Sequence, residues 1–175
     1  MDFAFTEEQE LFRKSVRAFC EKQLVPRINE IDEEEEIPHE IIEDMGALGL
    51  LGIAISKEYG GSEGGFFRAA IAAEEIARAD ISMATAVYYL VETGWGFLLD
   101  RYGSTRAKEE ILPDVVKGKT FLGIASTEAA GGSDIVSLTT AMARRDDRKL
   151  CSTQAPRFSH GDSAVTVVVI RHLYI

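Results

Sequence analysis

A short segment of the chain, residues 124–134, combines residue types that can hold an anionic or aromatic ligand. It contains three hydroxyl side chains and two adjacent glycines: Ser126, Thr127, Ser133, Gly131 and Gly132. Glycines allow a backbone to approach a ligand closely and to direct several amide N–H groups at one anion. Hydroxyl groups can donate to a ring carbonyl or to a phosphate oxygen. By themselves these residues fit either a phosphate-binding loop or a plain turn between two strands.

Two common nucleotide-binding motifs do not match this segment. A dinucleotide-binding fold requires G-x-G-x-x-G at the opening of a helix, and a Walker loop requires a Lys-Ser/Thr pair after its glycines. Residues 124–134 contain neither pattern. Any ligand held here would therefore be bound in a different way.

Other candidate residues lie within the apolar segments before residue 100, and each has a simpler explanation. Glu74, Glu75 and Glu92 could act as general bases, but a solvated helix face is the simpler interpretation of each. The histidines are scattered and lack the spacing of a metal site, so no metal is expected. His39, beside Pro38 at an acidic helix start, is expected to be exposed and structural. Four aromatic side chains could line a ligand pocket or belong to the core: Tyr88, Tyr89, Trp95 and Phe97.

The composition is that of a globular protein. The chain has 175 residues, of which 46% are hydrophobic and 27% charged. Its net charge of -10 disfavours binding to nucleic acid and to anionic membranes. No apolar run approaches the roughly 18 residues of a membrane span, and no signal peptide is recognisable. With two cysteines that have neither metal nor disulfide spacing, the sequence predicts a cytoplasmic protein without nucleic-acid or membrane partners.

The part of the chain before residue 118 has the pattern of helices. Thr6 and Gln9 have the spacing of a capping box, and apolar residues such as Leu11 and Val16 follow at helical intervals. Pro38 suits the first turn of a second helix. Three further helices are predicted: residues 66–79, residues 81–99, and a helix that is capped by Ser104 and ends at Pro113 and Gly118.

After residue 119 the pattern changes to that of strands. Residues 120–126 and 137–144 are typical of short strands, and the β-branched run 165–170 is typical of a buried one. Helices followed by strands predict an α+β protein. We expect an N-terminal all-α domain over residues 1–118 and a β-domain over residues 119–175.

Five motifs in this order resemble the acyl-CoA dehydrogenase family. The most specific is Thr127-Glu128-x-x-x-Gly132-Ser133-Asp134, which resembles the family signature T-E-P-x-x-G-S-D. The resemblance runs almost continuously from Asp2 to about Arg145. The other four motifs are Phe5-Thr6-Glu7-Glu8-Gln9, Met45-Gly46-x-x-Gly49-Leu50, Glu58-Tyr59-Gly60-Gly61, and Tyr102-Gly103-Ser104 with Leu112-Pro113.

The resemblance implies FAD as the cofactor. In the family, the strand and loop that match residues 124–133 lie along the flavin, so Ile124, Ser126 and Gly132 are expected beside it. The resemblance implies that Thr127 bonds the pyrimidine side of the isoalloxazine. It also implies that Ser133 touches both the FAD pyrophosphate and the pantetheine arm of the acyl-CoA substrate.

A second stretch is assigned to the cofactor by the same resemblance. The family has an aromatic-Ile-Thr/Ser triplet about thirty residues after its signature, and residues 157–159 align with it. Phe158 and Ser159 are therefore expected beside the flavin, with the Ser159 hydroxyl reaching N5. The resemblance also places the helix predicted over residues 81–99 beside the acyl chain.

Two features depart from the family pattern. Ala129 replaces the signature proline, which loosens a turn whose φ a proline would have fixed. Residues 150–157 lack the family's Asn-Gly turn, and Arg157 stands where an aromatic side chain is usual. Pro156 would remove one donor from a strand ladder. These departures indicate either local divergence or a damaged reading frame.

The resemblance implies α,β-dehydrogenation of an acyl-CoA thioester by a homo-oligomer that passes electrons to electron-transfer flavoprotein or a similar acceptor. In the family a C-terminal helical bundle carries the catalytic glutamate. We therefore expect the base beyond residue 175, an incomplete antiparallel β-domain and no bundle in this chain. By itself the chain is expected to bind FAD weakly or not at all and to lack dehydrogenase turnover.

Two other interpretations remain open. One is a non-catalytic product, either truncated or a helical interaction module that does not bind flavin. The other keeps the flavin but acts as an acyl-CoA oxidase or reductase, which these residues do not distinguish from a dehydrogenase.

Overall fold

The computed structural model describes residues 4–124, 141–145, 148–152 and 167–170. The chain divides into two compact units near Gly123, and each is considered by itself. The elements up to the first strand are α1 (Glu7–Phe19), a π-helical turn η1 (Cys20–Leu24), a 3-10 turn η2 (Val25–Arg27), α2 (Ile28–Glu34), α3 (His39–Ala47), a second 3-10 turn η3 (Lys57–Tyr59), α4 (Gly65–Ala79), α5 (Ala84–Tyr102), α6 (Thr105–Val116) and β1 (Phe121–Ile124).

Helix α1 begins at the predicted capping box. The Gln9 amide donates to the Thr6 hydroxyl at 3.2 Å, and the Thr6 amide donates to the Gln9 side-chain carbonyl at 2.9 Å. These bonds satisfy amides that have no partner within the helix. Val16 is buried on the inner face of α1, and Phe12 packs beside it. Leu11, predicted for the same face, is instead 67% exposed.

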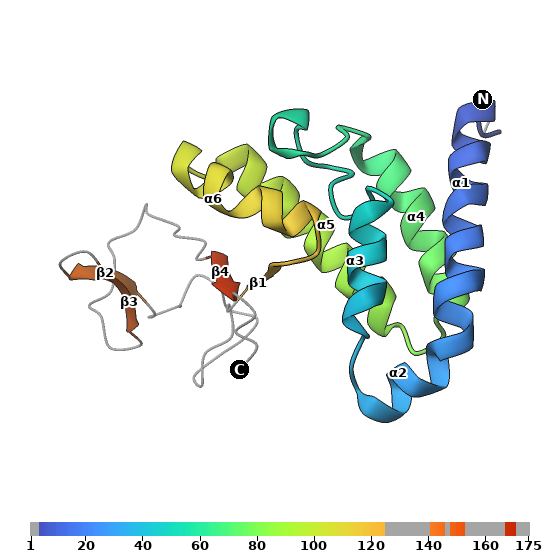
Figure 1. The fold of residues 1–175 in the computed structure, drawn as a ribbon. Coiled ribbons are helices and arrows are strands. Elements are labelled where there is room, and N and C mark those ends of the chain that lie inside the picture. Colours follow the sequence, from blue (N-terminus) through green and yellow to red (C-terminus); the bar gives the residue numbers. More distant parts are fainter. Residues whose placement is uncertain (1–3, 125–140, 146–147, 153–166, 171–175) are drawn as a thin grey trace. The chain divides into compact units, whose positions relative to one another are not determined.

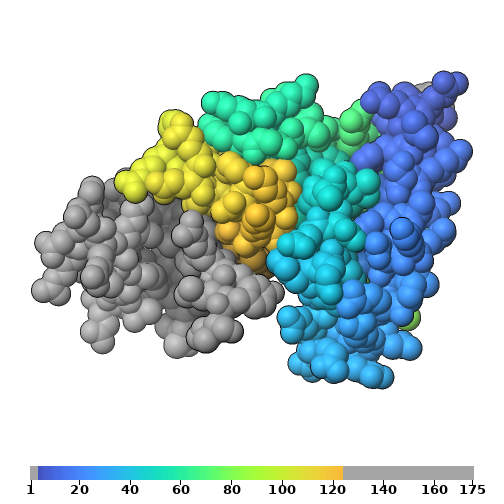
Figure 2. Space-filling view, in the orientation of Figure 1, coloured from blue at the N-terminus to red at the C-terminus, as the bar shows by residue number. Residues whose placement is uncertain are grey.

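The helices pack around two hydrophobic cores. Helix α1 packs against α4, α4 against α5, and α5 against α6 (Figure 1). The larger core contains Leu24, Ile41, Met45, Ile76 and Tyr89 among its buried members. The smaller core joins α5, α6 and β1 through Ile55, Leu99, Leu112, Val115 and Leu122. On the outside, α1 and the segment through α2 and α3 form one continuous surface, dark blue to cyan in the space-filling view (Figure 2).

A buried ion pair joins α1 to α4. Glu75 is 1% exposed, and two nitrogens of Arg17 donate to its carboxylate at 2.8 and 2.7 Å. Arg78 donates to the same carboxylate at 3.2 Å. The bonds from Arg17 hold the pKa of Glu75 below its usual value. The prediction of a solvated position was therefore wrong for Glu75, whereas Glu74 is exposed as predicted.

Helix α5 begins three residues later than predicted, at Ala84. The Asp80 carboxylate accepts hydrogen bonds from the amides of Ser82 and Thr85, at 3.0 and 2.8 Å, and from the Ser82 hydroxyl at 2.6 Å. These bonds stabilise a turn between α4 and α5 in place of helix. Met83 closes that turn in the left-handed region with φ 65°.

Helix α6 continues through Pro113 and ends at Val116, so its end lies between the two residues predicted to mark it, Pro113 and Gly118. Ser104 caps its first turn as predicted. An interior proline removes one helical N–H donor. Val115 and Val116 nevertheless continue the helix beyond the proline, because both are buried in the smaller core. The chain turns away at Gly118, whose φ of 71° suits glycine.

The strands described are short. Besides β1 they are β2 (Ala141–Arg145), β3 (Arg148–Ser152) and β4 (Val167–Ile170). Strands β2 and β3 pair antiparallel, with Met142 opposite Cys151, and β1 pairs with β4. Strands β1, β2 and β4 overlap the three segments predicted to be strands. A complete β-domain, and its boundary with the helical domain near residue 118, remain predictions.

Candidate functional site

Most of the residues predicted to bind the cofactor lie outside the described parts of the chain. These are Ser126, Thr127, Gly132, Ser133, Phe158 and Ser159. Ile124 is described as the last residue of β1. The strand β1 therefore leads, in the sequence, directly into the predicted site.

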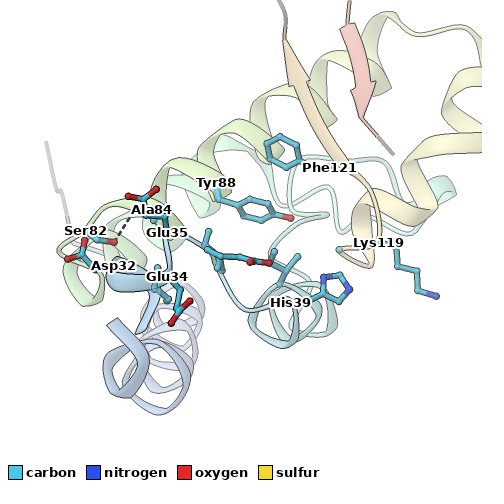
Figure 3. A pocket seen from close by; sticks show the side chains of 14 residues that line it. Asp32, Glu34, Glu35, His39, Ser82, Ala84, Tyr88, Lys119 and Phe121 are labelled. Carbon is cyan, nitrogen blue, oxygen red and sulfur yellow. Dashed lines mark hydrogen bonds between the residues drawn. The ribbon is translucent and has the colours of Figure 1, made fainter. Parts of the chain in front are cut away.

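A cavity of about 700 Å³ lies in the helical unit next to β1. Three places in the chain form it: the end of α2 with the start of α3, the start of α5, and the turn from α6 into β1 (Figure 3). Its lining residues are Ile31, Asp32, Glu34, Glu35, Glu36, Ile37, His39, Ile42, Ser82, Ala84, Tyr88, Gly118, Lys119 and Phe121.

An aromatic pair forms one wall of this cavity. The rings of Tyr88, from α5, and Phe121, from β1, are stacked with centroids 5.4 Å apart and planes at 22° (Figure 3). Burial raises the pKa of the Tyr88 phenol, and the nearby Glu92 carboxylate raises it further. Tyr88 therefore stays protonated at neutral pH. The stack joins helix α5 to the first residue of β1.

The opposite side of the cavity is acidic. Asp32, Glu34, Glu35 and Glu36 contribute four carboxylates, and all four residues are exposed. Lys119 also lines the cavity, but its side chain extends away from these acids (Figure 3). This charge distribution repels phosphate groups. The cavity accordingly suits an uncharged, apolar group and does not suit a diphosphate.

His39 is part of the cavity wall. It was predicted to be an exposed, structural residue, and its side chain is 40% exposed with Nε2 3.4 Å from a Glu43 carboxylate oxygen. Since Glu43 lies one turn further along α3, this contact is local to the helix. The geometry therefore agrees with a structural role for His39.

Glu92 is the second acidic residue, after Glu75, that was wrongly predicted to lie on a solvated helix face. Its side chain is fully buried, and its Oε1 accepts the backbone N–H of Leu122 in β1 at 2.7 Å. Its other oxygen, Oε2, is buried and has no hydrogen-bond partner in the described part of the chain. Burial raises the pKa of Glu92 to about 8, although the bond from Leu122 acts in the opposite direction. The sequence signal is a lone acid in the apolar stretch 88–99.

The four aromatic residues of α5 do not meet in one pocket. Tyr88 lines the cavity, but Tyr89 is completely buried in the larger core. Trp95 packs against the smaller core. Phe97 lines a second cavity of about 490 Å³ and contacts the ring of Phe66. Tyr88 and Tyr89 cannot line one pocket, because consecutive positions of a helix point in different directions.

Within the described residues, no group of three or more potential metal ligands occurs. Among the described helices, none combines the length and apolar character needed to cross a bilayer.

Comparison with known proteins identifies relatives across almost the whole chain. The family model described as "Acyl-CoA dehydrogenase, N-terminal domain" matches residues 6–119. The short-chain specific acyl-CoA dehydrogenase of Clostridium acetobutylicum is 33% identical over 170 residues, which is 97% of this chain and 44% of that protein. The acryloyl-CoA reductase (NADH) of Anaerotignum propionicum is 35% identical over 171 residues, 97% of this chain and 43% of that protein.

Solved structures resemble the fold as well. The glutaryl-coenzyme A dehydrogenase complex with glutaryl-CoA matches with a TM-score of 0.77 and 33% identity, covering 86% of this chain and 39% of that one. The butyryl-CoA dehydrogenase of Megasphaera elsdenii matches with a TM-score of 0.72 and 28% identity, covering 84% and 39%. The chain thus spans less than half the length of the relatives it matches.

Proposed function

We propose, from the premise that this chain belongs to the acyl-CoA dehydrogenase family, that it supplies the N-terminal helical domain and the flavin-contacting strand of an FAD-dependent enzyme. The observation that carries the proposal is the match of residues 6–119 to the N-terminal domain of that family. The strand β1 follows this domain directly and leads into the segment that carries the signature Thr127-Glu128-x-x-x-Gly132-Ser133-Asp134.

The donor groups of residues 124–133 suit FAD. Two adjacent glycines, Gly131 and Gly132, can present backbone amides to a diphosphate. The hydroxyls of Ser126, Thr127 and Ser133 can donate to ring carbonyls or phosphate oxygens. The diphosphate is assigned to this segment and not to the cavity beside Tyr88, because the cavity's acidic side disfavours anions.

The proposed reaction is α,β-dehydrogenation of an acyl-CoA thioester. When bound, FAD supplies the acceptor for the hydride that leaves the β-carbon. Thr127 and Ser159 would orient the flavin ring, with Phe158 beside it, and Ser133 would bind both the diphosphate and the pantetheine arm. The α-proton passes to a carboxylate, and no residue of this chain is proposed as that base.

An apolar face of α5 fits the acyl chain. Val87 and Leu90 are 52 and 55% exposed, and their spacing of three residues places them on one side of the helix. Met83, in the turn just before α5, is 44% exposed. Large exposed apolar side chains in a row mark a contact surface. This face supports the proposal that α5 lies beside the acyl chain of the substrate.

The whole enzyme is proposed to be a cytoplasmic homo-oligomer that transfers electrons to electron-transfer flavoprotein or a similar acceptor. A solved structure described under the electron transferring flavoprotein of Acidaminococcus fermentans resembles the chain, with 25% identity and a TM-score of 0.76.

A second candidate activity is the reverse reaction, reduction of an α,β-unsaturated thioester. The observation that favours it is the 35% identity to an acryloyl-CoA reductase. The same flavin contacts would serve both directions. Two rates distinguish the activities: the rate at which an enoyl-CoA reoxidises the reduced flavoenzyme, and the rate at which the saturated acyl-CoA reduces the oxidised flavoenzyme. A faster reoxidation would favour the reductase.

Titration of FAD fluorescence tests the proposed cofactor site. The sequence left weak binding and no binding by the isolated chain both open, and we propose weak binding. We therefore expect saturable quenching, and an affinity about tenfold lower in Thr127→Ala and in Ser133→Ala, since each removes a proposed hydrogen bond to the cofactor. Ser62→Ala, at an exposed position of a distant loop, is the matched control and should bind as wild type does. Absence of quenching, or equal affinity in all four proteins, would contradict the proposal.

A further inference from the structure

We propose that Glu92 is a positioning residue, whose buried carboxyl group fixes the backbone of β1 at Leu122, immediately before the flavin-contacting segment. The inference rests on the proposed function, because positioning β1 matters for catalysis only if the segment that follows it binds FAD. Glu92 itself is not proposed to touch substrate or cofactor.

The contact between Glu92 and β1 is direct. The Leu122 amide donates to Glu92 Oε1 at 2.7 Å, although the two residues are 30 positions apart in the sequence. Both residues are fully buried. A buried backbone N–H must have an acceptor, and here a side chain of α5 provides it. The position of β1 therefore depends on a group that belongs to another element.

A second contact one turn earlier on α5 acts on the neighbouring residue of β1. Tyr88, four residues before Glu92, stacks on Phe121. Successive residues of a strand point to opposite faces, so the Phe121 stack and the burial of Leu122 fix both faces of β1. The hydrogen bond that the Leu122 amide donates to Glu92 ties the backbone of β1 itself to α5 at this point.

The cost of burying Glu92 argues against a role in packing alone. Glu75, also buried, has two arginine partners, whereas Glu92 has no cationic partner in the described part of the chain. A buried carboxyl group with an unpaired oxygen is destabilising, and an apolar side chain of the same size would fill the space better. An apolar side chain could not accept the hydrogen bond that the Leu122 amide donates to Glu92.

Amide hydrogen exchange at Leu122, measured by NMR on the full chain, tests the inference. Glu92→Gln keeps an acceptor oxygen and should leave Leu122 protected. Glu92→Met keeps the volume but has no carbonyl oxygen, and it should accelerate Leu122 exchange by at least about tenfold. Thr93→Val is the matched control, because Thr93 is also buried, lies next to Glu92 on α5, and keeps its shape as valine; it should not change Leu122 exchange.

The outcomes separate this inference from the proposed function. Equal Leu122 protection in Glu92→Met and wild type would overturn the positioning role, whatever the chain does with FAD. If Leu122 loses protection in Glu92→Met, FAD affinity should fall in the same variant and be restored in Glu92→Gln; unchanged affinity would also overturn it. A wild-type chain that does not quench FAD at all would instead contradict the proposed function, and the exchange data would still decide whether Glu92 fixes β1.

Discussion

Glu75 and Glu92 are both buried carboxyl groups, and their surroundings shift their pKa values in opposite directions. Arginine donors lower the pKa of Glu75, so this residue is charged in the folded protein at neutral pH. Burial without a cation raises the pKa of Glu92 to about 8. Glu75 therefore contributes stability that is lost as the pH falls below the usual glutamate range. Glu92 contributes stability that is lost as the pH rises.

The replacement Glu92→Gln should change how stability depends on pH. The folded pKa of Glu92 is about 8, against a usual value of 4.5, so below 4.5 both folded and unfolded states are protonated. Between these values the unfolded state ionises first, so the free energy of unfolding falls as the pH rises. The variant lacks this group, and we expect a flatter curve over that window in urea denaturation.

Glu74→Gln provides the control for this measurement. Glu74 is exposed on α4, so its removal should leave the slope of the wild-type curve between pH 4.5 and 8 unchanged. The same slope in Glu92→Gln as in wild type would show that Glu92 is ionised equally easily in the folded and unfolded states.

At the scale of elements, two glycines of the helical unit should respond oppositely to the same replacement. A Cβ on Gly61 would lie 2.0 Å from the Ile55 carbonyl oxygen and 2.7 Å from that of Gly52, both backbone atoms. A Cβ on Gly94, within α5, would meet nothing within 4 Å. We expect Gly61→Ala to destabilise the fold by about 2 kcal/mol or more, because the loop before α4 must shift.

Gly94→Ala should stabilise the protein by up to about 1 kcal/mol, because alanine has the higher helix propensity and meets no obstacle. Chemical denaturation of both variants compares the two effects on one scale. A Gly61→Ala protein as stable as wild type would mean that residues 55–61 do not pack as the structure has them.

Local signals in the sequence predicted the elements that depend on local contacts. The capping box of Thr6 and Gln9 and the alanine-rich pattern of α4 were sufficient to predict both helices. The start of α5 was predicted wrongly, because the Asp80 side chain bonds the amides of Ser82 and Thr85, a local signal that was missed. The end of α6 was predicted at Pro113 and Gly118, and the burial of Val115 and Val116, which has no local pattern, carries the helix past the proline.

The same distinction applies to the site. A contiguous signature directed attention to residues 124–133, whereas the cavity and the Glu92–Leu122 bond were not predicted. Both are formed by residues that are far apart in the sequence, as the 30 positions between Glu92 and Leu122 illustrate. A lone acid among apolar residues is compatible with a solvated or a buried position, and only the packing of α5 against β1 decides between them.

At the scale of the whole molecule, the chain presents a helical domain with an apolar face on α5. Val87 and Leu90 remain exposed on that face, and Met83 is exposed in the turn before it. Its relatives are more than twice as long as this chain, and the activity proposed here is that of the whole enzyme. By itself, this chain is proposed to contribute a domain that fixes β1, the strand that precedes the segment proposed to hold the flavin.

Chemical-shift mapping of the isotope-labelled chain during titration with FAD tests this central claim most directly, since it detects weak binding and locates it. The account predicts the largest shifts at the amides of Thr127, Gly132 and Ser133, smaller ones along β1, and none along α1. An absence of shifts within residues 124–133 at the highest FAD concentration, or shifts confined to the helices, would contradict it.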